Sequence, residues 1–178
     1  VIGANGTSFT IMTGCTASID ALLVGQQLIQ SGVIDVCLVG GADAPLNDWT
    51  TNGFKKIRAL TNETDIEKAG VPFSTSYKGF VVAEGAAVLV LEREQAAKQR
   101  QQKIYGKVER VVSRNEGLKM LHSDATGTHM LEVFQQTVGQ IKPTYINSQA
   151  LGMEINDRIE QKIAEQCFGN QVPITSIK

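Results

Sequence analysis

One strand–helix–strand pattern near the start of the chain does most to constrain its fold. Residues 7–13, TSFTIMT, are rich in Thr, Ile and Phe and predict a strand. Residues 16–31 carry an apolar stripe at three- and four-residue spacing that predicts a helix, which Gly32 ends. Residues 35–40, DVCLVG, are almost wholly apolar, as in a strand buried on both faces. A helix that crosses between two strands implies parallel neighbours, so the pattern predicts an α/β layer arrangement.

The alternation of strand and helix continues along the chain. Periodicity predicts helices over 48–60, 93–102, 127–138 and 156–168, and strands over 80–92, from 103 onward, over 143–151 and over 171–178. Two similar α/β units therefore follow each other. We expect the first over residues 1–92, a helical connection over 93–103, and the second over 104–178.

Composition excludes several classes of protein. With 42% hydrophobic residues, 20% charged residues and a net charge of −1, the chain is typical of a globular protein and offers no basic surface for nucleic acid. No apolar run has the length of a membrane span, and the three cysteines have neither metal-site nor disulfide-framework spacing. We therefore expect a cytoplasmic protein with reduced thiols, no bound metal and no membrane contact.

Cys15 lies between the first predicted strand and the first predicted helix, in TGCTASIDALL. The unpaired N–H groups and partial positive charge at a helix start stabilise a thiolate and a developing oxyanion, and Gly14 permits a tight corner. The alternative is a small core residue, which the local pattern alone favours because free cysteine is among the most buried residue types. Cys37, within a strand, and Cys167, on a helix, are interpreted as core residues.

Four segments in order resemble the β-ketoacyl synthases, the condensing enzymes of fatty acid and polyketide synthesis, and especially the aromatic (type II) polyketide ketosynthases. TGCTASIDALLVGQQLIQSGVIDVCLVGGADAP is similar to the nucleophile segment, and PFSTSYKGFVVAEGAAVLVLE to the second landmark of that family. YINSQALGMEINDRIEQKIAEQCFG and VPITSIK resemble the third and fourth. The resemblance runs over nearly the whole chain.

The resemblance implies a thiolase-like fold, in which a duplicated α/β unit forms stacked α-β-α-β-α layers, incomplete here at both ends. It also implies a dimer, either a homodimer or a heterodimer with another ketosynthase-type subunit. The predicted strand over residues 7–13 would then pair with the partner subunit rather than form a free edge.

The resemblance assigns roles to individual residues. Cys15 falls on the nucleophile position, with Gly14 and Thr16 forming the sharp turn around it. Lys178 falls on the lysine of the family and Glu160 on the glutamate expected to pair with that lysine, while Asp157 matches an acidic residue three positions earlier. The substrate would be an acyl chain on the phosphopantetheine arm of an acyl carrier protein, and no separate cofactor is expected.

The chain departs from the family at the third landmark. Gln149 stands in place of the first of two histidines that hold the thioester carbonyl of the extender, and an amide cannot take the charge states of an imidazole. The swaps to Ala150, Leu151 and Met153 are expected to make a loop lining the pantetheine more apolar. The second histidine of the family lies beyond Lys178, outside this sequence.

The second landmark is altered as well. Ser74, Tyr77 and Lys78 stand where the family has an acidic residue and an Arg-Asp pair, so we expect the charge reversal at Lys78 to disrupt a local salt bridge. His122 and His129 match no family motif, and we interpret both as surface or loop residues.

Two functions are compatible with these residues. The first is an acyltransferase that accepts an acyl group on Cys15 from a carrier-protein thioester, with condensation impaired by the loss of the histidines. The alternative is a non-catalytic, chain-length-factor-like or scaffold partner of a competent ketosynthase. We also expect that the chain is a piece of a longer synthase, which is compatible with either function.

Overall fold

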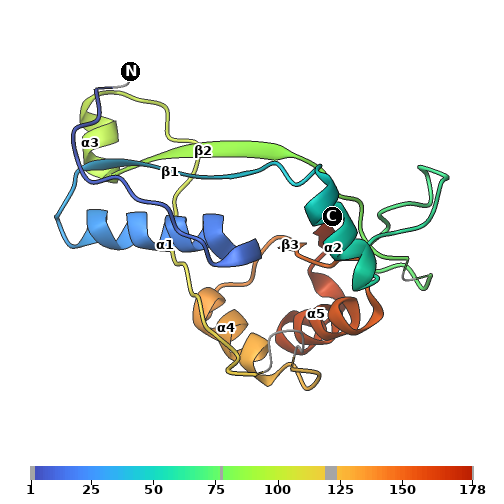
Figure 1. Cartoon of the computed structure of the whole chain (residues 1–178). Helices are drawn as coiled ribbons and strands as arrows, with labels where there is room; N and C mark the ends of the chain where they lie inside the picture. The colour runs from blue at the N-terminus through green and yellow to red at the C-terminus, as the bar shows by residue number, and fades with distance from the viewer. Residues whose placement is uncertain (1–2, 77, 119–123, 178) are drawn as a thin grey trace. The chain divides into compact units, whose positions relative to one another are not determined.

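The structure is a computed structural model that describes residues 3–76, 78–118 and 124–177 (Figure 1). Its helices are α1 (Ala17–Gln30), α2 (Asp48–Lys56), α3 (Glu94–Gln99), α4 (Thr128–Val138) and α5 (Glu154–Phe168), with short 3₁₀ turns η1 (Gly14–Thr16) and η2 (Gly169–Gln171). Its strands are β1 (Val36–Asp43), β2 (Gly85–Glu92), β3 (Ile146–Ser148) and β4 (Ile174–Ser176). The chain divides into a first unit, Val1–Ala42 with Ala86–Ser113, and a second unit, Asp43–Gly85 with Arg114–Lys178.

The first unit is built on β1, which pairs with β2, and on α1 (Figure 1). The buried Gly25 brings α1 against the strands, since a Cβ at this position would lie 2.6 Å from Val39 Cγ1 and 3.0 Å from Cys37 Sγ. Other side chains of these two strands remain exposed to solvent, including Val88 of β2 at 66% and Val90 of β2 at 64% exposure. The predicted burial of residues 35–40 on both faces is therefore wrong within this chain.

Two predicted strands are absent from the first unit. Residues 7–13 and 103–113 lie outside every helix and strand that the structure describes. A strand exists only where a neighbour completes its hydrogen-bond ladder, and the described residues supply none here. The segment over 103–113 is instead held to α1 by Gln26, whose Nε2 donates to Val108 O at 2.8 Å.

The second unit contains a short parallel βαβ motif. β3 and β4 pair in parallel with Ile146 opposite Ile174 and Ser148 opposite Ser176, and α5 connects them along the chain. Ile159 and Ile163 of α5 are buried at 7% and 2% exposure, and α4 packs against α5. The crossover predicted from the periodicity of residues 143–178 is confirmed, with strands shorter than expected.

Helix α2 and strand β2 form within the predicted ranges but are shorter than predicted. α2 begins at a proper cap, because the Asn47 side chain accepts a hydrogen bond from Thr50 N at 3.0 Å. The strand predicted over 80–92 begins only at Gly85, while Phe80 forms an isolated parallel bridge with Leu60.

Among the described residues, no helix has the length and apolar content needed to cross a membrane.

Candidate active site

The turn around Cys15 is made by the 3₁₀ turn η1 leading directly into α1. Gly14 has a φ of +74°, a left-handed conformation that a residue with a Cβ rarely adopts. Thr16 is the N-cap of α1, and its hydroxyl makes no capping bond. Cys15 therefore sits immediately before the unpaired N–H groups at the positive end of a 14-residue helix.

The three cysteines differ in exposure. Cys15 is exposed, whereas Cys37 and Cys167 are half-buried, and burial raises the pKa of both of those thiols. The interpretation of Cys15 as a core residue is therefore wrong. Of the three thiols, Cys15 has the open position that a reaction with a large thioester requires.

The loop after β3 carries the predicted Gln149, and its backbone is hydrogen-bonded at almost every residue. Ala150 N donates to Ser148 Oγ at 2.8 Å, and Ala150 O accepts from Ser176 Oγ at 2.8 Å. Gly152 O accepts from Gly79 N at 3.0 Å. These bonds fix the loop, while the side chain of Gln149 remains exposed.

Glu160 of α5 holds the start of this loop. Its carboxylate accepts a short hydrogen bond from Ser148 Oγ and a second from Gln149 N at 3.2 Å. Burial raises the pKa of the Glu160 carboxyl, the two hydrogen bonds act in the opposite direction, and the charge of Asp157 adds to the rise. The structure thus joins the predicted Glu160 and Gln149, whereas the predicted partner Lys178 lies outside the described residues.

Asp157 holds the rest of the loop. It is 1% exposed, and its Oδ1 accepts from Leu151 N at 2.9 Å and from Met153 N at 3.3 Å. Its Oδ2 accepts from Phe73 N at 2.8 Å, at a residue with a φ of +60°. One buried carboxylate therefore connects the second and third landmarks.

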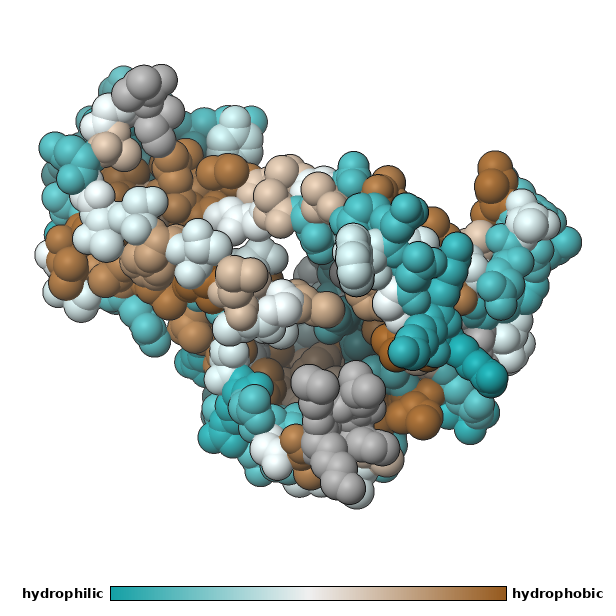
Figure 2. Space-filling model, in the orientation of Figure 1, coloured by the Kyte–Doolittle hydropathy of each residue, from teal (hydrophilic) through white to brown (hydrophobic). Residues whose placement is uncertain are grey.

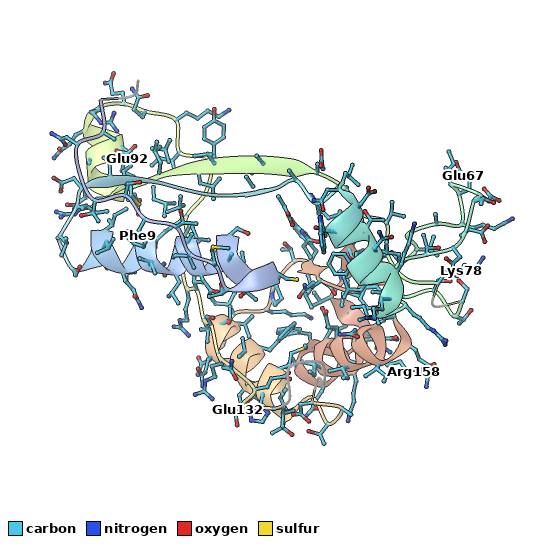
Figure 3. All side chains as sticks on the ribbon, in the orientation of Figure 1. Phe9, Glu67, Lys78, Glu92, Glu132 and Arg158 are labelled. Atoms are coloured by element: carbon cyan, nitrogen blue, oxygen red, sulfur yellow. The ribbon has the colours of Figure 1, made fainter. Side chains whose placement is uncertain are left out.

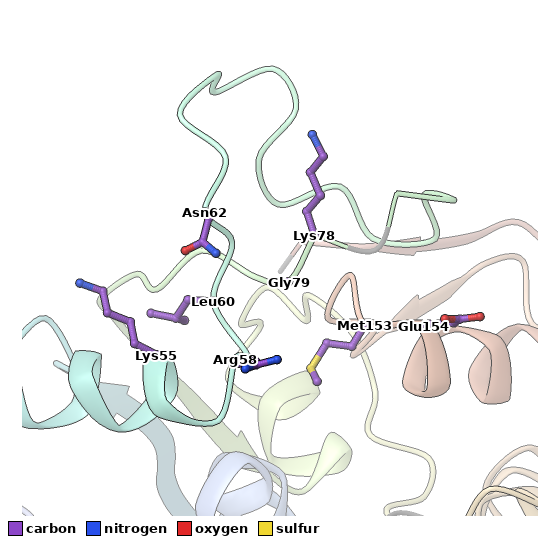
Figure 4. A pocket seen from close by; sticks show the side chains of 8 residues that line it. All are labelled: Lys55, Arg58, Leu60, Asn62, Lys78, Gly79, Met153 and Glu154. Atoms are coloured by element: carbon purple, nitrogen blue, oxygen red, sulfur yellow. The ribbon is translucent and has the colours of Figure 1, made fainter.

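A hollow of about 580 Å³ lies in the second unit (Figure 4). Its lining consists of Lys55, Arg58, Leu60, Asn62, Lys78, Gly79, Met153 and Glu154. Met153 thus supplies apolar surface to a cavity. Ala150 does not, because it is fully buried at 0% exposure.

The charge reversal at Lys78 does not leave the second landmark without an ion pair. Lys78 lies on the loop before β2 and forms a salt bridge with Glu63, whose side chain is 20% exposed (Figure 3). An acidic side chain 15 residues earlier instead meets the lysine, so a different ion pair forms at this position. Ser74 contacts Ser76, with 2.9 Å between their hydroxyls, and Tyr77 lies outside the described residues.

His129 is the second residue of α4, where its Nδ1 lies 3.2 Å from Asp124 Oδ2. This half-exposed position agrees with the predicted surface role. His122 lies outside the described residues.

Two residues of these networks carry no sequence signal of their own. Ser148 ends β3 and is the hydroxyl donor to Glu160, and Asp20 contacts the threonines on both sides of Cys15. A short polar residue in a strand or on the first turn of a helix is common, so only the folded contacts distinguish these two.

The chain is similar to proteins of one enzyme family. Residues 1–97 match the family described as "Beta-ketoacyl synthase, N-terminal domain". The tetracenomycin polyketide synthase ketoacyl synthase alpha subunit of Streptomyces glaucescens is 35% identical, covering 99% of this chain and 43% of that protein. The actinorhodin polyketide putative β-ketoacyl synthase 1 of Streptomyces coelicolor is 32% identical, covering 99% and 40%.

A solved structure is similar over the same extent. The type II polyketide synthase AntDE:AntF, an acyl-carrier protein in complex with its ketosynthase bound to the hexaketide, superimposes with a TM-score of 0.91 at 32% identity. The match covers 99% of this chain and 46% of that one. The chain thus spans less than half the length of these relatives, and the predicted thiolase-like α/β fold is confirmed.

Proposed function

Because the chain belongs to the β-ketoacyl synthase family, we propose that it accepts an acyl group on Cys15 from the thioester of an acyl carrier protein. The observation that carries the proposal is the exposed thiol of Cys15 at the head of α1. The left-handed Gly14 and the absence of a side-chain cap on α1 leave room for a carbonyl to approach. The backbone N–H groups there are the donors that an acyl-transfer oxyanion needs.

The proposed step is a transthioesterification. The Cys15 thiol gives up its proton, and its sulfur attacks the thioester carbonyl to form a tetrahedral oxyanion near the head of α1. Collapse of that intermediate breaks the bond to the sulfur of the phosphopantetheine arm, which leaves as a thiolate and takes a proton. One thioester replaces another, so no oxidant, reductant or metal takes part.

We further propose that condensation is weak in this chain. Decarboxylation of a malonyl thioester places negative charge on the carbonyl oxygen, which the family stabilises with histidines. Gln149, on a loop held by Glu160 and Asp157, offers only neutral side-chain N–H donors at the position that resembles that of the first histidine. A neutral amide can donate a hydrogen bond to a carbonyl, but it cannot take the positive charge with which an imidazolium would offset a developing enolate.

The hollow lined by Lys55, Arg58 and Lys78 supports a carrier-protein partner. These side chains suit the phosphate of a phosphopantetheine arm, and the solved relative is a ketosynthase in complex with an acyl-carrier protein. Met153 and Leu60 supply apolar surface in the same hollow for the arm itself.

The test is to incubate the chain with a hexanoyl carrier protein and to weigh the intact protein. We expect a mass gain of one hexanoyl group that maps to Cys15 and is absent in Cys15→Ala, while Cys37→Ala and Cys167→Ala still gain it. Addition of malonyl carrier protein should then yield little β-ketoacyl product. The proposal is contradicted if iodoacetamide labels Cys15 but no acyl group is ever gained there.

The second candidate is a non-catalytic partner of a competent ketosynthase. It is favoured by residues 7–13, which have no strand neighbour among the described residues and include Phe9, labelled in Figure 3. Phe9 is 57% exposed and Met12 is 89% exposed. An exposed extended segment without a strand neighbour is suited to pairing with another subunit. In a reconstituted pathway, Cys15→Ala would keep product formation if the chain is a scaffold and would abolish it if the chain carries the acyl group.

A further inference from the structure

Asp20 is at the centre of a hydrogen-bond cluster around the nucleophile turn. It lies on the first turn of α1, and both threonines that flank the Gly14–Cys15 pair donate to the same oxygen of its carboxylate. Thr13 Oγ1 makes a short hydrogen bond to Asp20 Oδ2, and Thr16 Oγ1 donates to that oxygen at 2.8 Å. Thr16 Oγ1 also lies 3.3 Å from Thr13 O.

A third hydroxyl reaches Asp20 from a distant part of the chain. Ser113, at the end of the segment held to α1 by Gln26, donates a hydrogen bond to the Asp20 carboxylate. These hydroxyls, with Ser113 first, then Thr13 and Thr16, hold the pKa of the Asp20 carboxyl below its usual range. The Asp20 carboxylate therefore stays ionised near neutral pH.

The first turn of α1 also packs closely against β1. A Cβ added at Gly41 would lie 2.6 Å from Ser18 Cβ, so the glycine lets this turn lie directly on the strand. The close packing at Gly41 and the hydrogen bonds to Asp20 thus both constrain the first turn of α1. This turn follows directly after the exposed Cys15.

We propose that Asp20 is the positioning residue of the nucleophile, holding the turn over residues 13–16 through the Thr13 and Thr16 hydroxyls so that the Cys15 sulfur keeps one approach to the thioester carbonyl. This inference rests on the proposed acyl transfer. A cluster of hydroxyl donors around one ionised acceptor gives a rigid corner, and displacements near 1 Å reduce the rate of an oriented reaction by about 100-fold.

The test compares Asp20→Ala and Asp20→Asn with the matched control Asp35→Asn. Asp35 is an exposed carboxylate of the same unit that pairs with Arg93 at 3.1 Å. Two rates are measured at Cys15: acyl transfer from a hexanoyl-pantetheine thioester, and alkylation by iodoacetamide at one fixed pH. A double variant, Thr13→Val with Thr16→Val, removes the hydroxyls and keeps the charge.

We expect Asp20→Ala to slow acyl transfer about tenfold or more. Asp20→Asn should have a smaller effect, because its carboxamide oxygen still accepts a hydroxyl bond. In both Asp20 variants alkylation by iodoacetamide should keep its wild-type rate, because a small alkylating agent needs an exposed thiol but no fixed direction of approach. The double threonine variant should likewise slow acyl transfer and keep its alkylation rate, and Asp35→Asn should match the wild type in both rates.

Separate outcomes identify which proposal fails. If the wild-type chain is alkylated but never acylated, the proposed function fails, and the positioning role falls with it. If the wild-type chain is acylated and the Asp20 variants are acylated at the same rate, the positioning role alone is overturned. It is also overturned if circular dichroism finds the Asp20 and threonine variants all unfolded, because Asp20 would then support only the fold.

Discussion

At the scale of single residues, buried carboxylates organise the loop that follows β3. Glu160 and Asp157 accept hydrogen bonds from the backbone of residues 149–153, so two acidic side chains of α5 hold a loop that lacks regular structure. Ser148 adds a hydroxyl donor to Glu160. Burial raises the pKa of the Glu160 carboxyl, whereas the hydrogen bonds from Ser148 and Gln149 lower it.

The raised pKa of Glu160 predicts a pH dependence of stability. A carboxyl whose pKa is higher in the folded protein favours folding fully below its ordinary value near 4.5, and that contribution is lost as the pH rises through the folded-state pKa. Glu160→Gln has no such proton, so its melting temperature should fall less than that of the wild type as the pH rises above 4.5.

The measurement is the melting temperature by circular dichroism from pH 4 to pH 8, taken as the difference between wild type and variant. Glu165→Gln is the matched control, because Glu165 is exposed on the same helix and accepts only a surface bond from Gln161 at 2.9 Å. Parallel curves for wild type and Glu160→Gln would contradict the prediction.

At the scale of elements, α1 depends on one glycine for its distance from the strands. Gly25 is buried, and a Cβ there would lie 2.6 Å from Val39 Cγ1 and 3.4 Å from Leu91 Cδ1. Gly53 of α2 is the opposite case, because a Cβ there would meet nothing within 4 Å. These two helical glycines therefore separate packing from helix propensity.

Replacing each glycine by alanine should have opposite effects. In an open helix interior, alanine gains about 0.5–1 kcal/mol of stability over glycine. Gly53→Ala should therefore raise the free energy of unfolding by about that amount. Gly25→Ala should lower it by about 1–3 kcal/mol, because overpacking at Val39 outweighs the propensity gain. Urea titrations measure both changes, and a stabilised Gly25→Ala variant would mean that α1 does not depend on this close approach.

At the scale of the whole molecule, charge and apolar surface are distributed unevenly. Brown surface gathers over the part formed by α1, β1 and β2 (Figure 2), where Val36, Leu38 and Leu89 are about half exposed. The second unit carries the hollow with Lys55, Arg58 and Lys78. Of these cations, Lys78 forms a salt bridge with Glu63. Substitutions of Lys55 and Arg58 therefore give the clearest test of whether the hollow binds an anionic arm.

Replacing Lys55 and Arg58 by Glu should slow loading of Cys15 from an intact carrier protein by about tenfold or more, since rim charges act mainly on association. Loading from a short N-acetylcysteamine thioester, which has no phosphate, should be unchanged. Lys162→Glu, an exposed change of the same kind on α5, is the control. The carrier role of the hollow is refuted if both thioesters are affected equally or neither is affected.

Much of the fold could be read from periodicity. The repeat of apolar residues predicted α1, α4 and α5, and the strand–helix–strand order predicted the parallel pairing of β3 with β4. Helices are predictable in this way because their hydrogen bonds lie within one segment. The strands predicted over 7–13 and from 103 onward do not form among the described residues, because a strand depends on a neighbour that local sequence does not specify.

For the candidate site, the residue types and their local order follow from the sequence alone: Cys15 before a helix, Gln149 after a strand, and acidic residues at 157 and 160. Folding sets the exposure of Cys15, the hydrogen bond by which Glu160 holds the backbone of Gln149, and the contacts of Asp20 with Thr13 and Thr16 around the nucleophile. Residue identity follows local chemistry, whereas exposure and hydrogen-bond partners depend on segments far apart in the chain that only folding brings together.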